Sequence, residues 1–494
     1  MSTVLYAEDW PQAFGPNGDF TVNGKAVDSF SVSMDENILW RTPMPSTGQG
    51  TPIISNGRIF VTSHERMEED SEMGSDIVGI CLDAKTGNKL WERKIPGTRT
   101  TDLSSLFSDN TAASPVSDGE RVVFMSVGGT IASFDFEGKE LWTHKWTPFG
   151  RHHARAHEPI LYDGMVIVAH TPKYDLPIEA TTKAGSKALG RGKEYWNFLR
   201  AYDLKTGKLL WQAEAGTSVH STSMLGQLAK GKLAILTGRG GGHQPPEEPY
   251  GLSMIDLTSG KSIWDQSIKG YPAAQNASWN KNGVYFFAGS MHQSLSSRTG
   301  KMKKESSIFE KVSITKWNGK DYEIKHNQTL KKSKKPITYF TNILIGDYHY
   351  FRSFEGFMIG RVNLKNGKVE YLEVPAQIIR ENGKKEELLW GKTVPNDMKN
   401  ADGFKATMDK RNAGSGWGHV SSAPPIVIGD LIYFPTMVGI VYVLKWNTKT
   451  LDEEALVSIN DLGRAGETWS LSGLAYVEGK IFARTLKEMI CIGR

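Results

Sequence analysis

The chain has 494 residues, and its charge is nearly balanced, with 59 Lys and Arg against 54 Asp and Glu. A net charge of +5 is too mild to indicate a nucleic-acid partner, and no basic stripe with interleaved aromatic residues occurs. No apolar run is long enough to cross a membrane as a helix. We therefore expect neither a nucleic-acid partner nor a transmembrane segment.

The start of the chain resembles the end of an export signal. Thr3-Val4-Leu5-Tyr6-Ala7 precedes Glu8-Asp9, with Ala7 at the cleavage position, but the charged start and most of the apolar core are missing. This hint favours a periplasmic or secreted protein whose signal peptide is truncated. Cys81 and Cys491 lie in apolar, strand-like runs without metal or haem spacing, which predicts buried free thiols.

One motif recurs along the chain, consisting of Asp, a Gly four residues later and a Trp four residues further on. It occurs at 83–91, 203–211 and 256–264, with a shortened copy at 135–142 and a degenerate copy at 363–371. The Asp side chain can bond the turn backbone, and Gly allows a positive φ, so the motif predicts a hairpin. We expect its Trp to pack against the neighbouring blade.

A second set of tight turns marks a hairpin in each of eight units. Each turn is flanked by β-branched and aromatic residues, as strands require. The turns are Asn56-Gly57, Asp118-Gly119, Asp163-Gly164, Lys230-Gly231, Asn282-Gly283, Gly346-Asp347, Gly429-Asp430 and Glu478-Gly479. The last unit supplies only three strands, and residues 37–42 resemble the missing Trp-bearing fourth strand. The pattern predicts an all-β, eight-bladed β-propeller of four-stranded antiparallel blades, its last blade closed by an N-terminal strand.

The Asp-x-x-Thr-Gly-x-x-x-Trp motif resembles the tryptophan-docking repeat of pyrroloquinoline-quinone-like (PQQ-like) propellers. Asp9-Trp10-Pro11-Gln12, Gly15-Pro16-Asn17-Gly18 and Glu467-Thr468-Trp469-Ser470-Leu471 are similar to sequences in a subgroup of exported bacterial proteins of mostly unknown function. The resemblance covers almost the whole chain. It implies the propeller fold and says little about function, because one propeller scaffold supports many activities.

The connections divide into two sets that lie on opposite faces. The turns listed above are tight, whereas the other connections are long, with insertions at about 171–197, 306–336 and 375–420 after an N-terminal extension of about 1–35. Elaborated loops on one face of a single domain predict that this face carries function.

Histidines concentrate on the predicted functional face. His157, His220 and His419 precede innermost strands, so they can converge as ligands of a divalent metal with an open coordination position. We assign His157, His220, Arg239 and Glu467 as candidate catalytic residues. The candidate substrate-binding residues are His243, His292, Arg155, Trp417, Trp469 and Lys487. For Arg239, pairing with Glu247 or Glu248 is an equally good interpretation.

Three functions compete. A lyase or hydrolase acting on a carbohydrate, such as an acidic polysaccharide fragment, would use the His and Arg residues to stabilise an enolate. The alternative is a non-catalytic binding or scaffold propeller, as related PQQ-like propellers are outer-membrane assembly factors. A quinoprotein dehydrogenase is disfavoured because no adjacent cysteine pair and no haem attachment motif occur, so we do not expect PQQ. We expect a monomer with a small-molecule or oligosaccharide ligand.

Overall fold

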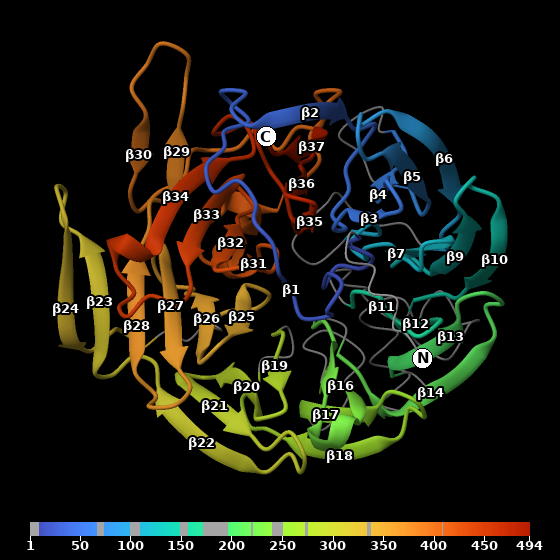
Figure 1. The fold of residues 1–494 in the computed structure, drawn as a ribbon, viewed down its shortest axis with the longest axis horizontal. Coiled ribbons are helices and arrows are strands. Elements are labelled where there is room, and N and C mark those ends of the chain that lie inside the picture. The colour runs from blue at the N-terminus through green and yellow to red at the C-terminus, as the bar shows by residue number, and fades with distance from the viewer. Residues whose placement is uncertain are drawn as a thin grey trace.

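The computed structural model describes residues 9–66, 74–98, 109–148, 157–170, 196–218, 221–239, 250–271, 275–332, 337–407 and 409–494. Within them, eight sheets form a ring around a central axis (Figure 1). Each blade contains four antiparallel strands, which are consecutive in the chain in blades 1 to 7, with the innermost strand first. The predicted eight-bladed propeller is confirmed.

The first four blades are built from consecutive strands. Blade 1 contains β3 (Ile53–Ser55), β4 (Arg58–His64), β5 (Ile77–Asp83) and β6 (Lys89–Ile95). Blade 2 contains β7 (Val116–Ser117), β8 (Arg121–Ser126), β9 (Thr130–Asp135) and β10 (Glu140–Lys145). Blade 3 contains β11 (Ile160–Tyr162), β12 (Met165–His170), β13 (Phe198–Asp203) and β14 (Leu209–Gly216). Blade 4 contains β15 (Met224–Gln227), β16 (Leu233–Arg239), β17 (Gly251–Asp256) and β18 (Ser262–Ser267).

The remaining blades follow the same order until the ring closes. Blade 5 contains β19 (Ser278–Asn280), β20 (Gly283–Ala288), β21 (Met291–Leu295) and β22 (Met302–Ser307). Blade 6 contains β25 (Asn342–Ile345), β26 (Tyr348–Arg352), β27 (Met358–Asn363) and β28 (Val369–Glu373). Blade 7 contains β31 (Ile426–Ile428), β32 (Leu431–Pro435), β33 (Ile440–Lys445) and β34 (Leu456–Asp461). Blade 8 contains β35 (Ala475–Val477), β36 (Lys480–Arg484), β37 (Glu488–Ile492) and, from the N-terminal part, β2 (Ile38–Pro43).

The two chain ends close the last blade, as the sequence predicts. β2 pairs antiparallel with β37, and Arg41 binds Glu488 through two hydrogen bonds of 2.7 and 2.8 Å. Closure leaves no gap in the ring, so no blade face is left exposed at a seam. In the described part of the chain no helix is long and apolar enough to cross a membrane.

A Trp in the fourth strand ties one blade to the next at four of the junctions. The indole Nε1 of Trp142 donates to the carbonyl of Leu204 in the hairpin turn of blade 3, at 2.9 Å. Trp40, Trp91 and Trp264 make the equivalent bond with the following blade, at 3.2, 2.7 and 2.8 Å. The predicted packing of this Trp against its neighbour is therefore confirmed.

Strands in two of the insertions lie at the outer edge of the ring and not over its axis. β23 (Val312–Trp317) pairs parallel with β28, and β24 (Tyr322–Gln328) extends the same sheet outwards. β29 (Gln377–Ile379) and β30 (Glu387–Leu389) form a second peripheral hairpin (Figure 1). Trp317 stacks on Trp390 at 5.0 Å between ring centroids and joins the two hairpins. The insertion at 171–195 lies outside the described residues.

Short helical turns complete the described structure. They are η3 (Ala229–Gly231), η4 (Lys410–Ala413), η5 (Glu453–Ala455) and the one-turn helix α2 (Trp417–Val420). Both cysteines are buried and free, in β5 and β37, as predicted.

Candidate functional site at the propeller axis

The N-terminal segment runs through the centre of the ring. Trp10 pairs with Ile54 on β3, the carbonyl of Pro11 accepts from the amide of Ser117 on β7, and Gln12 accepts from the amide of Leu161 on β11. The segment then crosses to blade 7, where β1 (Thr21–Val22) pairs parallel with β31. Its aromatic side chains Trp10, Phe14 and Phe20 are buried in the main core. Residues 9–22, called the axial segment below, therefore cross the centre of the ring from blade 1 to blade 7.

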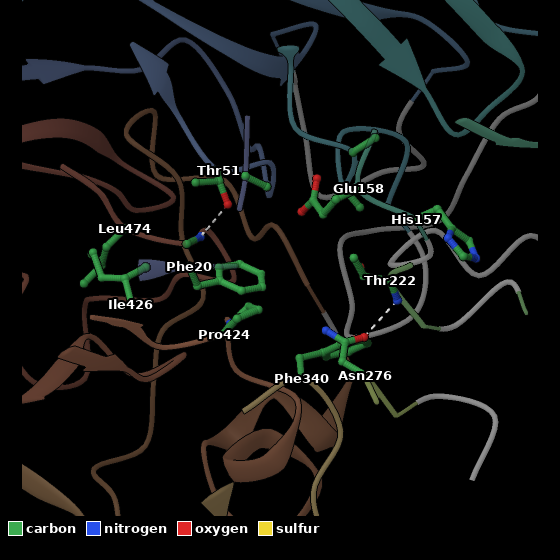
Figure 2. Close-up of a pocket in the computed structure, with 14 residues that line it drawn as sticks. Phe20, Thr51, His157, Glu158, Thr222, Asn276, Phe340, Pro424, Ile426 and Leu474 are labelled. Atoms are coloured by element: carbon green, nitrogen blue, oxygen red, sulfur yellow. Dashed lines mark hydrogen bonds between the residues drawn. The ribbon is translucent and has the colours of Figure 1, made fainter. Parts of the chain in front are cut away.

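A pocket lies above the axial segment, on the face of the long connections (Figure 2). It is lined by Ala13, Phe20, Thr51, Ala112, Ala113, His157, Glu158, Thr222, Asn276, Phe340, Pro424, Ile426, Gly473 and Leu474. We call it the axial pocket. It lies on the face that the loop lengths predict to be functional.

The axial pocket is built from one repeated position. The residue two places before the innermost strand is Thr51 in blade 1, Glu158 in blade 3 and Thr222 in blade 4. The same position holds Ser114, Asn276, Phe340, Pro424 and Gly473 in the other blades. Seven of these eight residues line the pocket, because each innermost strand begins at the same height around the axis.

Hydrogen bonds between blades hold this ring of residues together. On one side, Gly473 N donates to Thr51 Oγ1 at 3.1 Å, and Thr51 N donates to Ser114 Oγ at 2.7 Å. On the other side, Thr222 N donates to Asn276 Oδ1 at 2.8 Å (Figure 2). Because small hydroxyl and amide side chains bond the neighbouring backbone, the pocket wall is positioned before a ligand binds.

Glu158 is the one ionisable side chain among these eight repeat positions. Its Oε2 accepts a hydrogen bond from Ser114 N at 2.7 Å, and the residue is half-buried. Figure 2 shows its carboxylate beside the pocket. A carboxylate held by a backbone amide in a concave polar site can orient a ligand or transfer a proton. Glu158 is absent from the sequence-based candidates, although comparison of the aligned blades singles it out.

His157 lines the axial pocket, and its ring points away from Glu158 (Figure 2). Its Nε2 faces the carbonyl of Ser218 and therefore carries the proton, and its Nδ1 lies 3.2 Å from the hydroxyl of Ser223. Burial lowers the pKa of His157 to about 4, so the imidazole is neutral at pH 7. In this arrangement His157 fixes blade 4 against blade 3.

Two of the three predicted metal ligands, His157 and His419, are engaged in contacts within the protein, and the third, His220, lies outside the described residues. His419 in α2 is fully buried against the Arg352 guanidinium, which contacts its Nδ1. Desolvation, with the Arg352 charge as a second cause, holds the pKa of His419 well below its usual range. The Arg352 cation lies beside the His419 ring, and both ring nitrogens of His157 are engaged in hydrogen bonds. Neither histidine therefore has a lone pair available for a metal ion. Among the described residues, no group of three or more His, Cys, Asp or Glu could hold a metal.

The other predicted site residues are spread over the molecule. Arg239 is buried at the end of β16 and pairs with Asp265, with 3.3 Å between Nη1 and Oδ1. Glu467 is exposed in a loop. The Nζ atom of Lys487 lies 3.6 Å from Oδ2 of Asp397. Trp469 belongs to the main core, whereas Trp417 packs on Tyr339 in a small cluster that also contains Phe340.

His292 is buried between blades 5 and 6. Its Nε2 lies 3.0 Å from His349 Nδ1, and His349 Nε2 lies 3.0 Å from Asn342 Oδ1. His292 therefore does not reach the axial pocket. Arg155, His220 and His243 lie outside the described residues.

The ring of Trp-linked blades with an axial pocket defines a propeller of the tryptophan-docking class. A model of the PQQ-like repeat family, described as "Outer membrane protein assembly factor BamB", matches residues 31–112 and 78–290, together more than half of the chain. The chain belongs to this family of PQQ-like repeat propellers. No curated protein matches its sequence.

Two solved structures, both quinohemoprotein alcohol dehydrogenases, show the same fold. The quinohemoprotein alcohol dehydrogenase ADHIIG from Pseudomonas putida HK5 superposes with a TM-score of 0.52 at 11% identity, covering 98% of this chain and 80% of that chain. The quinohemoprotein alcohol dehydrogenase from Comamonas testosteroni gives 0.50 at 12% identity, with the same coverage. BamB from Moraxella catarrhalis gives 0.47 at 11% identity, covering 92% of this chain and 97% of that chain.

Proposed function

We propose that this protein binds a carbohydrate unit in the axial pocket, with Glu158 as the group that anchors the ligand and supplies lyase- or hydrolase-type acid–base chemistry. The observation that carries the proposal is the single carboxylate in a ring of hydroxyl and amide side chains. These groups suit a ligand rich in hydroxyls, and Phe20 and Phe340 offer apolar surface to the face of a sugar ring.

His157 has a supporting role in this proposal. Its neutral imidazole bonds blade 4, so it fixes the backbone next to Glu158 and does not itself transfer a proton. Glu158 is then the residue on which both binding and reaction depend. We further propose a periplasmic or extracellular location, because the matching family model describes an outer-membrane assembly factor.

The experiment is a thermal-shift screen with neutral and uronate-containing oligosaccharides. In Glu158→Gln an amide oxygen can still accept from Ser114 N, but the charge is removed, so the variant is expected to fold normally. We expect at least one sugar to raise the Tm of the wild type, and this shift to disappear in Glu158→Gln. Glu387→Gln, an exposed change on the peripheral strand β30, is the matched control and should keep the shift.

Sugars that raise the Tm are then incubated with the protein and assayed for unsaturated uronates or new reducing ends. A shift retained in Glu158→Gln would contradict the assignment of that residue. If no sugar raises the Tm, the carbohydrate proposal fails. The second candidate, a binding or scaffold propeller, which the family match favours, would then take its place.

A further inference from the structure

A second cavity lies below the axial segment, on the face of the tight turns. Its cavity volume is about 240 Å³, and it is bounded by Asp19–Thr21 of the axial segment, Met224, β19 with its neighbours and β25. This lower recess shares only Phe20 and Asn276 with the axial pocket.

The lower recess lies beside the inner edges of β19 and β25, with which the axial segment does not pair. The axial segment covers the inner edges of β3 and β31 through Trp10 and β1. In the described part of the chain, by contrast, no strand pairs with the inner edge of β19 or β25. The outward-facing amides and carbonyls of such an edge can bond a ligand that enters the recess.

Asp19 supplies the only ionisable side chain among the residues that line the recess. Its Oδ1 accepts from Thr21 N at 3.0 Å and from Thr21 Oγ1 at 2.7 Å, so a local turn fixes the carboxylate. Within the described residues, Asp19 has no basic partner within salt-bridge distance. Desolvation by the recess walls raises the pKa of Asp19, although the residue is accessible to solvent.

The other polar side chains of the recess are neutral. Asn276, Asn280 and Asn342 carry amides and Ser278 carries a hydroxyl. Each already bonds within the protein: Asn276 Oδ1 accepts from Thr222 N and Asn280 Oδ1 from Asn282 N, both at 2.8 Å, and Ser278 Oγ donates to Asn342 Oδ1 at 3.0 Å, so only the second lone pairs of these oxygens remain for a ligand. The uncompensated charge is thus one fixed carboxylate among carbonyl and amide oxygens. That set matches the three donors of a primary ammonium group, whereas it is too poor in carboxylates for a tightly held divalent cation.

We propose that the lower recess is a second ligand site, which binds a small organic cation through its primary ammonium group at Asp19. The rest of the ligand lies along the open edges of β19 and β25. This site is distinct from the axial pocket, since the axial segment lies between them.

Calorimetric titration tests this proposal with three amines: ethanolamine, putrescine and glucosamine. Each is paired with a neutral counterpart: ethylene glycol, butanediol and glucose. We expect at least one amine to bind and its counterpart to bind at least tenfold more weakly. Asp19→Asn should weaken amine binding at least tenfold, since it keeps the oxygen that accepts from Thr21 but removes the charge.

Asp430→Asn is the matched control, because Asp430 is exposed in a tight turn of the same face and does not line the recess. Both this variant and Glu158→Gln should bind the amine as the wild type does. Loss of amine binding in either would overturn the location, and equal binding of the neutral counterpart would overturn the role of charge. The proposal also fails if none of the three amines binds, whatever the axial pocket does with sugars.

Discussion

At the residue scale, the glycines of the repeat are required for two different reasons, the backbone conformation of the turn and the close contact with a neighbouring blade. Gly207 has φ +70°, and a Cβ built there would lie 2.7 Å from the Trp142 ring. Gly164, in the tight turn of the same blade, has φ +72° but nothing within 4 Å of such a Cβ. The first glycine serves both the turn and the blade contact, whereas the second serves the turn alone.

The comparison of these two glycines predicts a difference in stability. Both Gly207→Ala and Gly164→Ala introduce backbone strain, which costs on the order of 1 kcal/mol. Only Gly207→Ala also displaces Trp142, and we expect a further loss of about 1–3 kcal/mol in the free energy of unfolding. Urea unfolding of both variants measures the difference. Equal losses would show that the Trp contact can relax without cost.

Buried histidines predict a stability that falls in mild acid. Desolvation lowers the pKa of His292 to about 3 and that of His157 to about 4, and the pKa values of His349 and His419 lie well below the usual range. Unfolded histidine binds a proton near pH 6.5. Between that pH and the folded pKa values, the unfolded state therefore holds more protons, so stability decreases as pH falls.

Urea unfolding between pH 7.5 and 5 isolates this effect, because carboxylates titrate lower. Each of these histidines should remove about 1.4 kcal/mol per pH unit below pH 6.5. In His292→Gln the side-chain amide can still donate to His349. The slope of the unfolding free energy against pH should then correspond to about one bound proton fewer. A stability independent of pH in this window would contradict the buried, neutral state of these rings.

At the element scale, the sequence defined the hairpins well. All eight tight turns connect the first and second strands of their blades, and the 37–42 segment closes blade 8 as β2. These predictions succeeded because turn chemistry is local and is repeated. The position of β23 and β24 was not predictable in the same way, since a parallel pairing with β28 depends on a contact distant in sequence.

The closing strand supplies a test at this scale. Trp40 on β2 packs over Gly87 and donates to Ala84 of blade 1, so it joins blade 8 to blade 1. Trp40→Ala should lower the free energy of unfolding by about 3 kcal/mol. Leu39→Ala, on the exposed face of the same strand, should change it by less than about 0.5 kcal/mol. Similar losses in both would mean that β2 adds only backbone pairing.

At the scale of the whole molecule, the face of the candidate site was predictable and most of its residues were not. Loop length indicated the face of the axial pocket, and His157 lines it. The remaining candidates were chosen for their chemistry, and residues such as Arg239 and His419 form internal pairs that only the folded blades reveal. The same repeat position across the blades would have identified Glu158.

The axial segment was also beyond sequence reasoning, because its partners lie on four different blades. Trp10, Pro11 and Gln12 contact blades 1, 2 and 3 in turn, before β1 reaches blade 7. Its residue Phe20 lines both the axial pocket and the lower recess.

The most direct test of the account is hydrogen–deuterium exchange with the oligosaccharide that gives the largest thermal shift. Binding in the axial pocket should slow exchange at the starts of the innermost strands, around residues 51–53, 114–116, 158–160 and 222–224, and leave the tight turns unchanged. Protection confined to the outer strands or to the peripheral hairpins β23–β24 and β29–β30 would contradict the account and place the ligand on the outer surface of the ring.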